Sequence, residues 1–378
     1  MGLETEERLE RSGRPDKRVR KLKSLAHGLA VVDVLLLIFC GLLVVRNIRI
    51  NRENNALKSR YESMQVATGQ PEAGAVSADT MGIPEDSVMV AAPAAGTSSN
   101  EATLTEIRSY AEQGKTFLFT LKQLFPQQFV LADEGRFHFV EIDPNLRPYT
   151  YDNSMISLSS DGIISYEDES VVTSYGIDVS QHNGPVDWDV LNEIEGKPDF
   201  VFVRAGIRGY GSGKLVADEQ VSANLIGAKK IGADTGVYFV TQAVNEEEAR
   251  EEARFVLDII KDYEVDMPIV LDVEKVENYD TEPRTKQLTA QEYSANLLAF
   301  ADEMSKNGRE TMIYGNGKTF MLMLDMKMLD GMGIWFADYV SEDDYIPYFP
   351  YDFKIWQFTS EGNVPGVTGY CDLNIRFD

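Results

Sequence analysis

Short apolar runs, separated by polar and helix-like segments, fill the C-terminal half of the chain. The runs are rich in β-branched and aromatic residues, which favour buried strands. The predicted strands are residues 175–178, 200–206, 236–242, 268–274, 311–317, 333–339 and 353–359. Several of them end in an acid, an aromatic residue or an amide.

The segments between several strands have the period of amphipathic helices. Asn245 and Glu248 form a capping-box signature, followed by apolar positions 249, 253, 256, 260 and 263. Thr289 and Glu292 form a second one, and Asn307–Gly308 is a predicted helix stop. Alternating strands and helices predict a parallel sheet. An open doubly wound sheet would also alternate, but no glycine-rich phosphate loop follows a strand, so the pattern favours a barrel.

The strand PIVLDVE carries two acids, Asp272 and Glu274, at its C-terminal end. Residues two apart on a strand point to the same face, so both carboxylates are aimed at one place. Hydrolysis of a glycosidic bond needs an acid that protonates the leaving oxygen and a second group that stabilises positive charge on the sugar. From this spacing alone, two surface acids at the end of a strand remain an equal alternative.

The motifs YGIDVSQHNGPVDW, GVYFVTQ, LDVE, GIWFADY and IWQFTSEGNVPGVTGYCDLNIRF occur in one order over residues 174–378. Together they resemble glycoside hydrolase family 25, the lysozyme-like N-acetylmuramidases that cut bacterial peptidoglycan. The resemblance implies an α/β fold with a TIM-like (β/α)-barrel of irregular form. It also implies cleavage of the β-1,4 bond between N-acetylmuramic acid and N-acetylglucosamine.

By this resemblance Glu274 is the general acid, and Asp272 assists at the reacting sugar. Asp178 and Asp372 are the two further acids of the site. The implied mechanism is retaining and substrate-assisted, with the 2-acetamido oxygen of the substrate as the nucleophile. No metal or cofactor is expected. The alternative is a catalytically weak glycan-binding or scaffold protein that uses the same barrel to hold the cell wall.

Aromatic residues near strand ends are the candidate sugar platforms. The candidates are Tyr238, Trp356, Tyr314, Trp335 and Tyr210, of which Tyr238 and Trp356 are favoured because their motif segments end strands. A core position is the alternative for each of them.

Four polar residues near these motifs have open assignments. Gln357 is one residue out of phase with Trp356 and is predicted to face the outer layer unless a bulge intervenes. His182 either lines the cleft or lies on a surface loop. Arg204 and Arg208 either pair with the acids or are solvated.

Residues 25–45 are apolar except for His27 and Asp33. As a helix this segment is roughly 31 Å long, enough to span a bilayer. The preceding tail, residues 1–24, is basic and predicted to be cytoplasmic. We therefore expect a single-pass protein of the bacterial cell membrane, bound to lipid through Leu25–Val45, with an extracytoplasmic catalytic domain. A cleaved signal peptide is the rival interpretation, but the run is long and Arg46–Ile48 is a poor cleavage site.

Two regions separate this span from the barrel. Residues 46–100 are predicted to be a polar stalk followed by an Ala-, Gly-, Pro- and Ser-rich linker. Residues 101–172 are predicted to be a small α+β module, with a helix over 104–124 and two pairs of short strands around turns that contain Asp and Gly. Wall binding, packing against the barrel and spacing are equally open roles for this module.

The charges of the two ends of the chain differ in sign. Residues 1–60 hold 13 Lys and Arg against 7 Asp and Glu, a net charge of +6, which leaves −31 for the remainder of the total of −25. A strongly acidic region repels phosphates, so nucleic acid is excluded as a partner, and peptidoglycan glycan strands are the expected partner. The sequence leaves the oligomeric state undetermined.

Overall fold

The computed structural model describes residues 97–276, 281–340 and 345–378. The chain divides into two units, residues 1–91 and 92–378, and the described residues all belong to the second. No helix among the described residues is long and apolar enough to cross a membrane. The predicted tail (1–24), the predicted span (25–45) and almost all of the predicted stalk and linker (46–100) lie outside the described residues.

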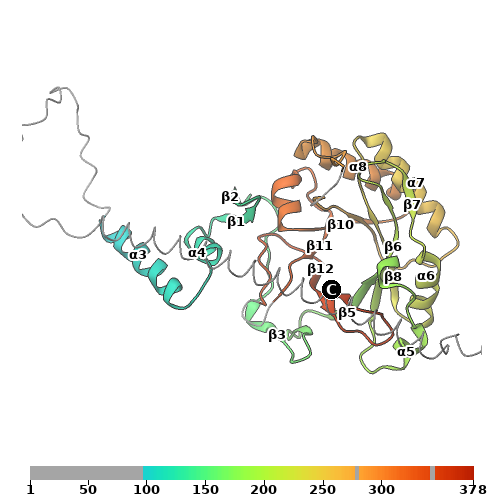
Figure 1. The fold of residues 1–378 in the computed structure, drawn as a ribbon, viewed down its shortest axis with the longest axis horizontal. Helices are drawn as coiled ribbons and strands as arrows, with labels where there is room; N and C mark the ends of the chain where they lie inside the picture. Colours follow the sequence, from blue (N-terminus) through green and yellow to red (C-terminus); the bar gives the residue numbers. More distant parts are fainter. Residues whose placement is uncertain (1–96, 277–280, 341–344) are drawn as a thin grey trace, which may run out of the picture. The chain divides into compact units, whose positions relative to one another are not determined.

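Eight strands close into a barrel, which confirms the predicted barrel fold (Figure 1). Around the barrel the order is β5, β13, β12, β11, β10, β9, β8 and β6, and β5 pairs with β6 to close it. The strands are β5 (Thr173–Val179), β6 (Phe200–Arg208), β8 (Asp234–Val240), β9 (Ile269–Asp272), β10 (Thr311–Asn316), β11 (Gly333–Ala337), β12 (Ile355–Gly362) and β13 (Cys371–Phe377). A short strand, β7 (Leu215–Ala217), extends β6 as an antiparallel hairpin.

The barrel is irregular because its last strand runs the other way. Strand β13 is antiparallel to both neighbours, β12 and β5, whereas the other strands are parallel. The connections on the outside are α5 (Trp188–Glu193), α6 (Val221–Lys230), α7 (Glu246–Ile260), α8 (Ala290–Lys306) and the π-helical η4 (Thr319–Met323). In the part of the chain that the structure describes, no helix follows β11 or β12.

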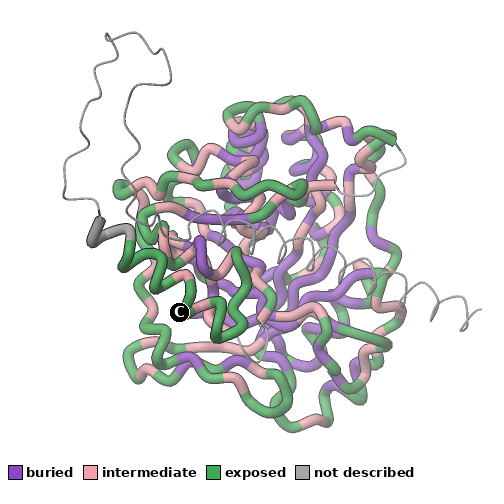
Figure 2. Tube along the Cα trace, turned by 60° about the vertical axis from the view of Figure 1, so that its left-hand side comes forward, coloured by how far each residue is buried: buried purple, intermediate pink, exposed green. Residues whose placement is uncertain are grey.

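The helix boundaries agree with the predicted caps. Asn245 caps α7 by accepting the amide of Glu248, although the Glu248 side chain accepts from Val244 and leaves the box incomplete. Thr289 and Glu292 form the complete capping box of α8. Helices α7 and α8 bury their apolar residues against the barrel, and Figure 2 shows the buried residues concentrated along the strands.

Alternation along the strands creates two apolar layers. The inner cluster fills the barrel and consists of Phe200, Phe202, Met267, Val270, Met312, Tyr314, Trp335, Ala337 and Ile355, with Tyr238 against it. Phe200 and Phe202 need room that only glycine gives, since a Cβ at Gly176 or Gly236 would lie 2.3 Å from their rings. The alternate residues face outward into the larger cluster beneath the helices.

The predicted α+β module packs against the barrel. It contains α3 (Thr97–Glu112), α4 (Phe117–Leu124), the hairpin β1 (Gln128–Asp133) with β2 (Arg136–Glu141), η2 (Asn153–Met155), and the hairpin β3 (Ile156–Leu158) with β4 (Ile164–Tyr166). The single predicted helix over 104–124 is wrong, because Gly114, at φ 72°, separates α3 from α4. Helix α3 also begins four residues before the predicted module boundary.

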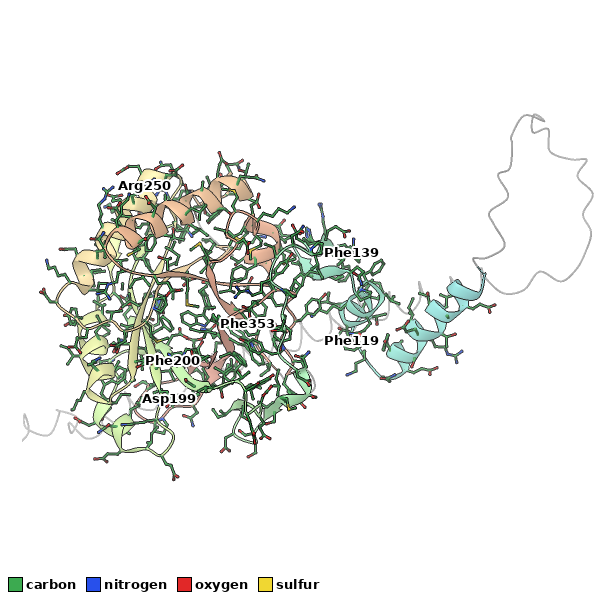
Figure 3. All side chains as sticks on the ribbon, turned by 180° about the vertical axis from the view of Figure 1, so that it is seen from behind. Phe119, Phe139, Asp199, Phe200, Arg250 and Phe353 are labelled. Atoms are coloured by element: carbon green, nitrogen blue, oxygen red, sulfur yellow. The ribbon has the colours of Figure 1, made fainter. Side chains whose placement is uncertain are left out.

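Aromatic contacts hold the module on the side of the barrel without covering helices (Figure 1). Tyr149 stacks on Phe353 at 5.3 Å between centroids, and Tyr151 stacks on Phe377 at 4.3 Å. Phe119 and Phe139 lie on the module and Phe200 lies in the barrel (Figure 3). Of the roles left open by the sequence, the structure therefore shows packing against the barrel.

Candidate active site

A cavity of about 490 Å³ lies where the parallel strands end, and all four predicted acids line it. Asp272 is the last residue of β9, and Glu274 follows two residues later. Asp178 lies near the end of β5, directly opposite Asp372 in the β5–β13 pairing. Because β13 is antiparallel, its first residues reach the same rim as the last residues of the parallel strands.

Two amides hold Asp178. Its Oδ2 accepts hydrogen bonds from Gln357 Nε2 at 2.8 Å and Asn374 Nδ2 at 2.9 Å. Burial, with 5 % of the residue exposed, raises the pKa of Asp178 to about 6. The two amide donors act in the opposite direction, and the negative charge of Glu274 adds to the rise in pKa.

Aromatic donors fix which way these amides point. Gln357 Oε1 accepts from Tyr314 Oη at 2.7 Å and from Tyr339 Oη at 3.0 Å. Asn374 Oδ1 accepts from Trp335 Nε1 at 2.8 Å. Since both amide oxygens are occupied, both amide nitrogens are left to donate to Asp178.

Asp272 is almost as deeply buried as Asp178 but lacks its amide donors. Only 6 % of the residue is exposed, and its Oδ1 is buried with no hydrogen-bond partner among the described residues. Burial raises its pKa well above the ordinary value, and the charges of Glu274, Asp178 and Asp372 raise it further, while Arg204 opposes them. An unpartnered buried carboxylate oxygen costs free energy, so this atom is suited to a donor brought by a ligand.

Glu274 and Asp372 lie nearer the mouth of the cavity. Burial raises the pKa of Glu274 above its ordinary value, although the residue is solvent exposed and water screens part of that effect. Burial and the charge of Asp178 raise the pKa of Asp372 to about 8. Each of the four acids therefore has a pKa above that of a free carboxyl group, a property that a general acid needs near neutral pH.

The described residues contain no group of His, Cys, Asp and Glu arranged to hold a metal ion. The cavity presents its four carboxyl groups with their amide partners, aromatic side chains, and the polar side chains of Arg204, His182, Ser180, Asn183 and Ser360.

Comparison with known families identifies the barrel. Residues 177–367 match the family model for glycosyl hydrolases family 25. The chain belongs to this family. Its membership confirms the prediction of a glycoside hydrolase, and the matched segment contains Asp178, Asp272 and Glu274. Residues 97–176, which form the module and the start of β5, lie outside it. No curated protein matches the chain.

Solved structures of related proteins include three bacterial enzymes. The autolysin LytC from Streptococcus pneumoniae, solved with a synthetic peptidoglycan ligand, has 22% identity and a TM-score of 0.48, covering 66% of this chain and 52% of that chain. The spore cortex lytic enzyme SleM from Clostridium perfringens has 25% identity and a TM-score of 0.48, covering 56% and 69%. A lysozyme from Streptomyces coelicolor has 21% identity and a TM-score of 0.41, covering 53% and 90%. The matched region thus spans about half of the LytC chain.

Three of the five candidate aromatic residues line the cavity. These are Tyr238, Tyr314 and Trp335, from three strands of the inner layer. Tyr210 lies in the turn between β6 and β7 and is not among the lining residues. Tyr339 and Tyr370 line the cavity from loops, where no strand periodicity marks them.

Trp356 and Gln357 have the opposite orientations to those predicted. Trp356 is 0 % exposed in the outer cluster, and its Nε1 donates to the carbonyl of Asp338. Gln357 lines the cavity and holds Asp178. The reason is the alternation of side chains along a strand. Ile355 faces the barrel interior, so Gln357, two residues later, faces it too. Asn374, which no sequence motif singles out as a site residue, lies two residues after Asp372 on the same face.

Arg204 lines the cavity, but its direct ion pair is with Asp218, at 2.7 Å between Nε and Oδ2, and not with the four acids. His182 satisfies both open interpretations, since it lines the cavity from an exposed position in η3 (Gln181–Asn183).

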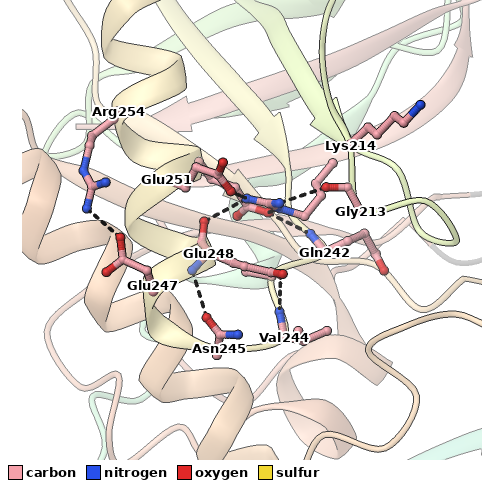
Figure 4. A network of polar contacts seen from close by, with 12 residues as sticks. Gly213, Lys214, Gln242, Val244, Asn245, Glu247, Glu248, Glu251 and Arg254 are labelled. Carbon is pink, nitrogen blue, oxygen red and sulfur yellow. Dashed lines mark hydrogen bonds and ion pairs between the residues drawn. The ribbon is translucent and has the colours of Figure 1, made fainter.

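Arg208 is buried away from the cavity and pairs with Glu252 at 2.7 Å and Glu251 at 2.8 Å. It also donates to the carbonyls of Gly213 and Glu248 (Figure 4). This network ties α7 to β6 and, through Glu252, to Gln242 just after β8. It therefore supports the rim of the barrel and is not part of the acid cluster.

Asp372→Asn tests the raised pKa of Asp372 through stability. At pH 4, close to the ordinary aspartate pKa, the folded and unfolded chains have parted little in stability through this group, so the substitution should have only a small effect. As the pH rises toward the folded pKa of about 8, the unfolded chain loses the proton first and the folded state loses stability. The variant of residues 97–378 should therefore melt several degrees higher than the wild type at pH 9 and at nearly the same temperature at pH 4. Calorimetry that gives equal shifts at both pH values would contradict this.

Proposed function

We propose that this chain is a peptidoglycan hydrolase of the muramidase type, which cleaves the β-1,4 bond between N-acetylmuramic acid and N-acetylglucosamine with retention of configuration. The observation that carries the proposal is the unpartnered oxygen of Asp272, buried in a cavity that also holds Glu274 with a raised pKa. A volume of about 490 Å³ is within the range of sites for small organic ligands. The motif resemblance to family 25 muramidases supplies the identity of the sugar.

Glu274 supplies the proton for the leaving oxygen. The residue lies at the cavity mouth, and burial raises its pKa, which favours the protonated form relative to a free glutamate. As the bond to the leaving sugar breaks, the 2-acetamido carbonyl oxygen of the substrate attacks the anomeric carbon. Water then attacks the same carbon, and Glu274, now ionised, takes a proton from it. Two displacements at one carbon retain its configuration.

Asp272 stabilises the cyclic oxazolinium formed in the first step. In the protein alone its pKa is raised because burial disfavours the charged form. The N–H of the acetamido group would donate to its unpartnered oxygen and favour the carboxylate. The positive charge that develops on the oxazolinium favours it further, so this interaction strengthens toward the transition state. Asp178, held by its two amides, keeps further negative charge beside the reacting sugar.

Aromatic side chains would bound the sugar. Tyr238 and Tyr314 line the cavity wall, and Trp335 lies between them with ring centroids 6.2 Å and 4.9 Å away. The hydroxyl of Tyr314 and the indole of Trp335 are at the same time donors that orient the amides around Asp178. The same aromatic side chains therefore line the substrate cavity and orient the amides that bind Asp178.

Glu274→Gln should abolish hydrolysis while leaving the fold intact. Glutamine has the same shape but no proton to transfer, and loss of a general acid costs about 100- to 10,000-fold in rate. The measurement is release of reducing ends from purified peptidoglycan by residues 97–378, with the circular dichroism spectrum as the control for folding. Turnover within about threefold of the wild type would remove Glu274 from this role and favour the glycan-binding alternative.

The first product should retain the anomeric configuration of the substrate, and Asp272→Asn should lower turnover strongly. Asparagine keeps the shape but cannot neutralise the oxazolinium. Proton NMR of a short glycan during the first turnovers distinguishes the anomers before they equilibrate. An inverted first product would eliminate attack by the acetamido group and require an activated water instead.

Tethering to the bacterial cell membrane completes the proposal. The apolar residues 25–45 and the basic residues before them support a single span with the barrel outside the cytoplasm. Protease added to cells stripped of their wall should then degrade the barrel while a tag at residue 1 survives. A protected C-terminal tag would reverse the topology, and soluble protein cut near residue 46 would indicate a signal peptide.

A further inference from the structure

The turn between β1 and β2 of the module reaches the segment that carries Glu274. Lys275, the residue after Glu274, places its Nζ 2.6 Å from Asp133 Oδ2 and 2.9 Å from Glu134 Oε1. Lys318, at the start of η4, places its Nζ 3.2 Å from Asp133 Oδ1. Hydrogen bonds from both lysines hold the pKa of Asp133 below its ordinary value, although burial acts to raise it.

Buried packing fixes the position of this turn. Phe129 of β1 stacks on Tyr348 at 4.6 Å between centroids, and the amide of Val130 donates to Tyr348 Oη at 2.9 Å. Phe129 also lies over Gly317, where a Cβ would come within 2.9 Å of its ring. The turn itself uses two residues with positive φ, Glu134 at 49° and Gly135 at 73°. Exposed ion pairs alone are weak, but here the strand that carries Asp133 is held by the core.

Lys275 and Glu274 share a second cavity of about 360 Å³, which Glu134 also lines. Both side chains line this cavity, so an ammonium released from the module turn would be free to approach the adjacent Glu274. In the structure the ammonium is bound to the turn. The hydrogen bond to Asp133 raises the pKa of Lys275, so the side chain remains charged.

We propose that Asp133 and Glu134 are positioning residues that hold the Lys275 ammonium away from Glu274, so that the module is part of the catalytic unit. The inference rests on the proposed role of Glu274 as proton donor. A cation beside a carboxyl group stabilises its ionised form, so a released Lys275 would favour loss of the proton from the general acid. The module thereby preserves the protonated state on which the first step depends.

Other charged groups also act on Glu274, and the test must hold them constant. Along the cavity these are Asp178 on β5, Arg204 on β6, Asp272 on β9, Asp372 on β13, the titratable Tyr238, Tyr314, Tyr339 and Tyr370, and His182 in η3; Lys286 lines the second cavity. Each belongs to the barrel and is unchanged by substitutions in the module turn. A shift produced by those substitutions and reversed at Lys275 is therefore attributable to Lys275.

The experiment measures the pKa of Glu274 directly, by NMR titration of the full chain labelled at glutamate carboxyl carbons and assigned by the signal lost in Glu274→Gln. Asp133→Asn with Glu134→Gln should lower this pKa by about one unit or more. Adding Lys275→Met should restore it, whereas Lys275→Met alone should leave it near the wild-type value. The alkaline limb of the kcat/KM profile should move by the same amounts.

A purely structural role for the ion pairs gives a different pattern. In that case Lys275→Met alone would have the same effect as the turn substitutions, because it removes the same contacts between Lys275 and the turn. The matched control is Asp143→Asn, which removes another ion pair between module and barrel, 3.0 Å from Asp143 to Lys327. It should leave the pKa of Glu274 unchanged.

The inference would be overturned by a Glu274 pKa that does not fall when the turn is neutralised, or by one that falls and is not restored by Lys275→Met. An equal fall in Asp143→Asn would assign the effect to loosening of the module and would also overturn it. The titration needs no turnover. A chain that is inactive on peptidoglycan therefore defeats the proposed function and leaves this measurement decisive.

Discussion

The mutual repulsion and burial of four carboxyl groups in one cavity is the constraint on which the rest of the site depends. Asp272 and Asp178 are almost fully buried, and burial is the largest cause of the raised pKa of each. Such a cluster can persist only if protons are shared or if donors compensate the charge. In this site two amides serve Asp178, whereas one oxygen of Asp272 has no partner among the described residues and is open to a donor from a ligand. The oxygen of Asp272 whose burial costs stability is thus the atom that is available to bind substrate.

Because the sheet closes into a barrel, alternate side chains of its strands all point into one interior and form this cavity. Phe200 and Phe202 occupy the interior over Gly176 and Gly236, and the residues above them on the inner faces become the floor and walls of the cavity. On β5 the alternation that puts Gly176 inside also puts Asp178 inside. The antiparallel β13 contributes Asp372 and Asn374 at the same rim because its direction is reversed. A parallel strand in that place would present these residues in the opposite order along the barrel.

The sequence is informative where the residues of a single strand or helix determine the feature that is predicted. Apolar runs mark the barrel strands, the predicted cap of α8 is correct, and the spacing of Asp272 and Glu274 puts both beside one cavity. Prediction fails where the side of the sheet that a residue faces depends on a neighbouring strand. The motif alone favours an inward Trp356, and only pairing with β11, which sets Ile355 beside Trp335, shows that Gln357 is the inward residue. The docking of the module is likewise invisible locally, because it depends on contacts between residues far apart in the chain, whereas the break at Gly114 is a local glycine signal that the helical period of the segment masks.

The module also replaces structure that the barrel lacks. In the described part of the chain, helices form the connections up to β11, and no helix follows β11 or β12 (Figure 1). Aromatic residues of the module pack on this side of the barrel instead. Phe353 and Phe377 pack against Tyr149 and Tyr151, so removing the module would expose a contiguous aromatic surface. The packing of the barrel core and the contacts of Lys275 therefore require the same N-terminal boundary of the folded unit. The unit that must stay intact begins at the helices before β1, and not at the first barrel strand, because one set of contacts closes the core while a neighbouring set holds the Lys275 ammonium beside Glu274.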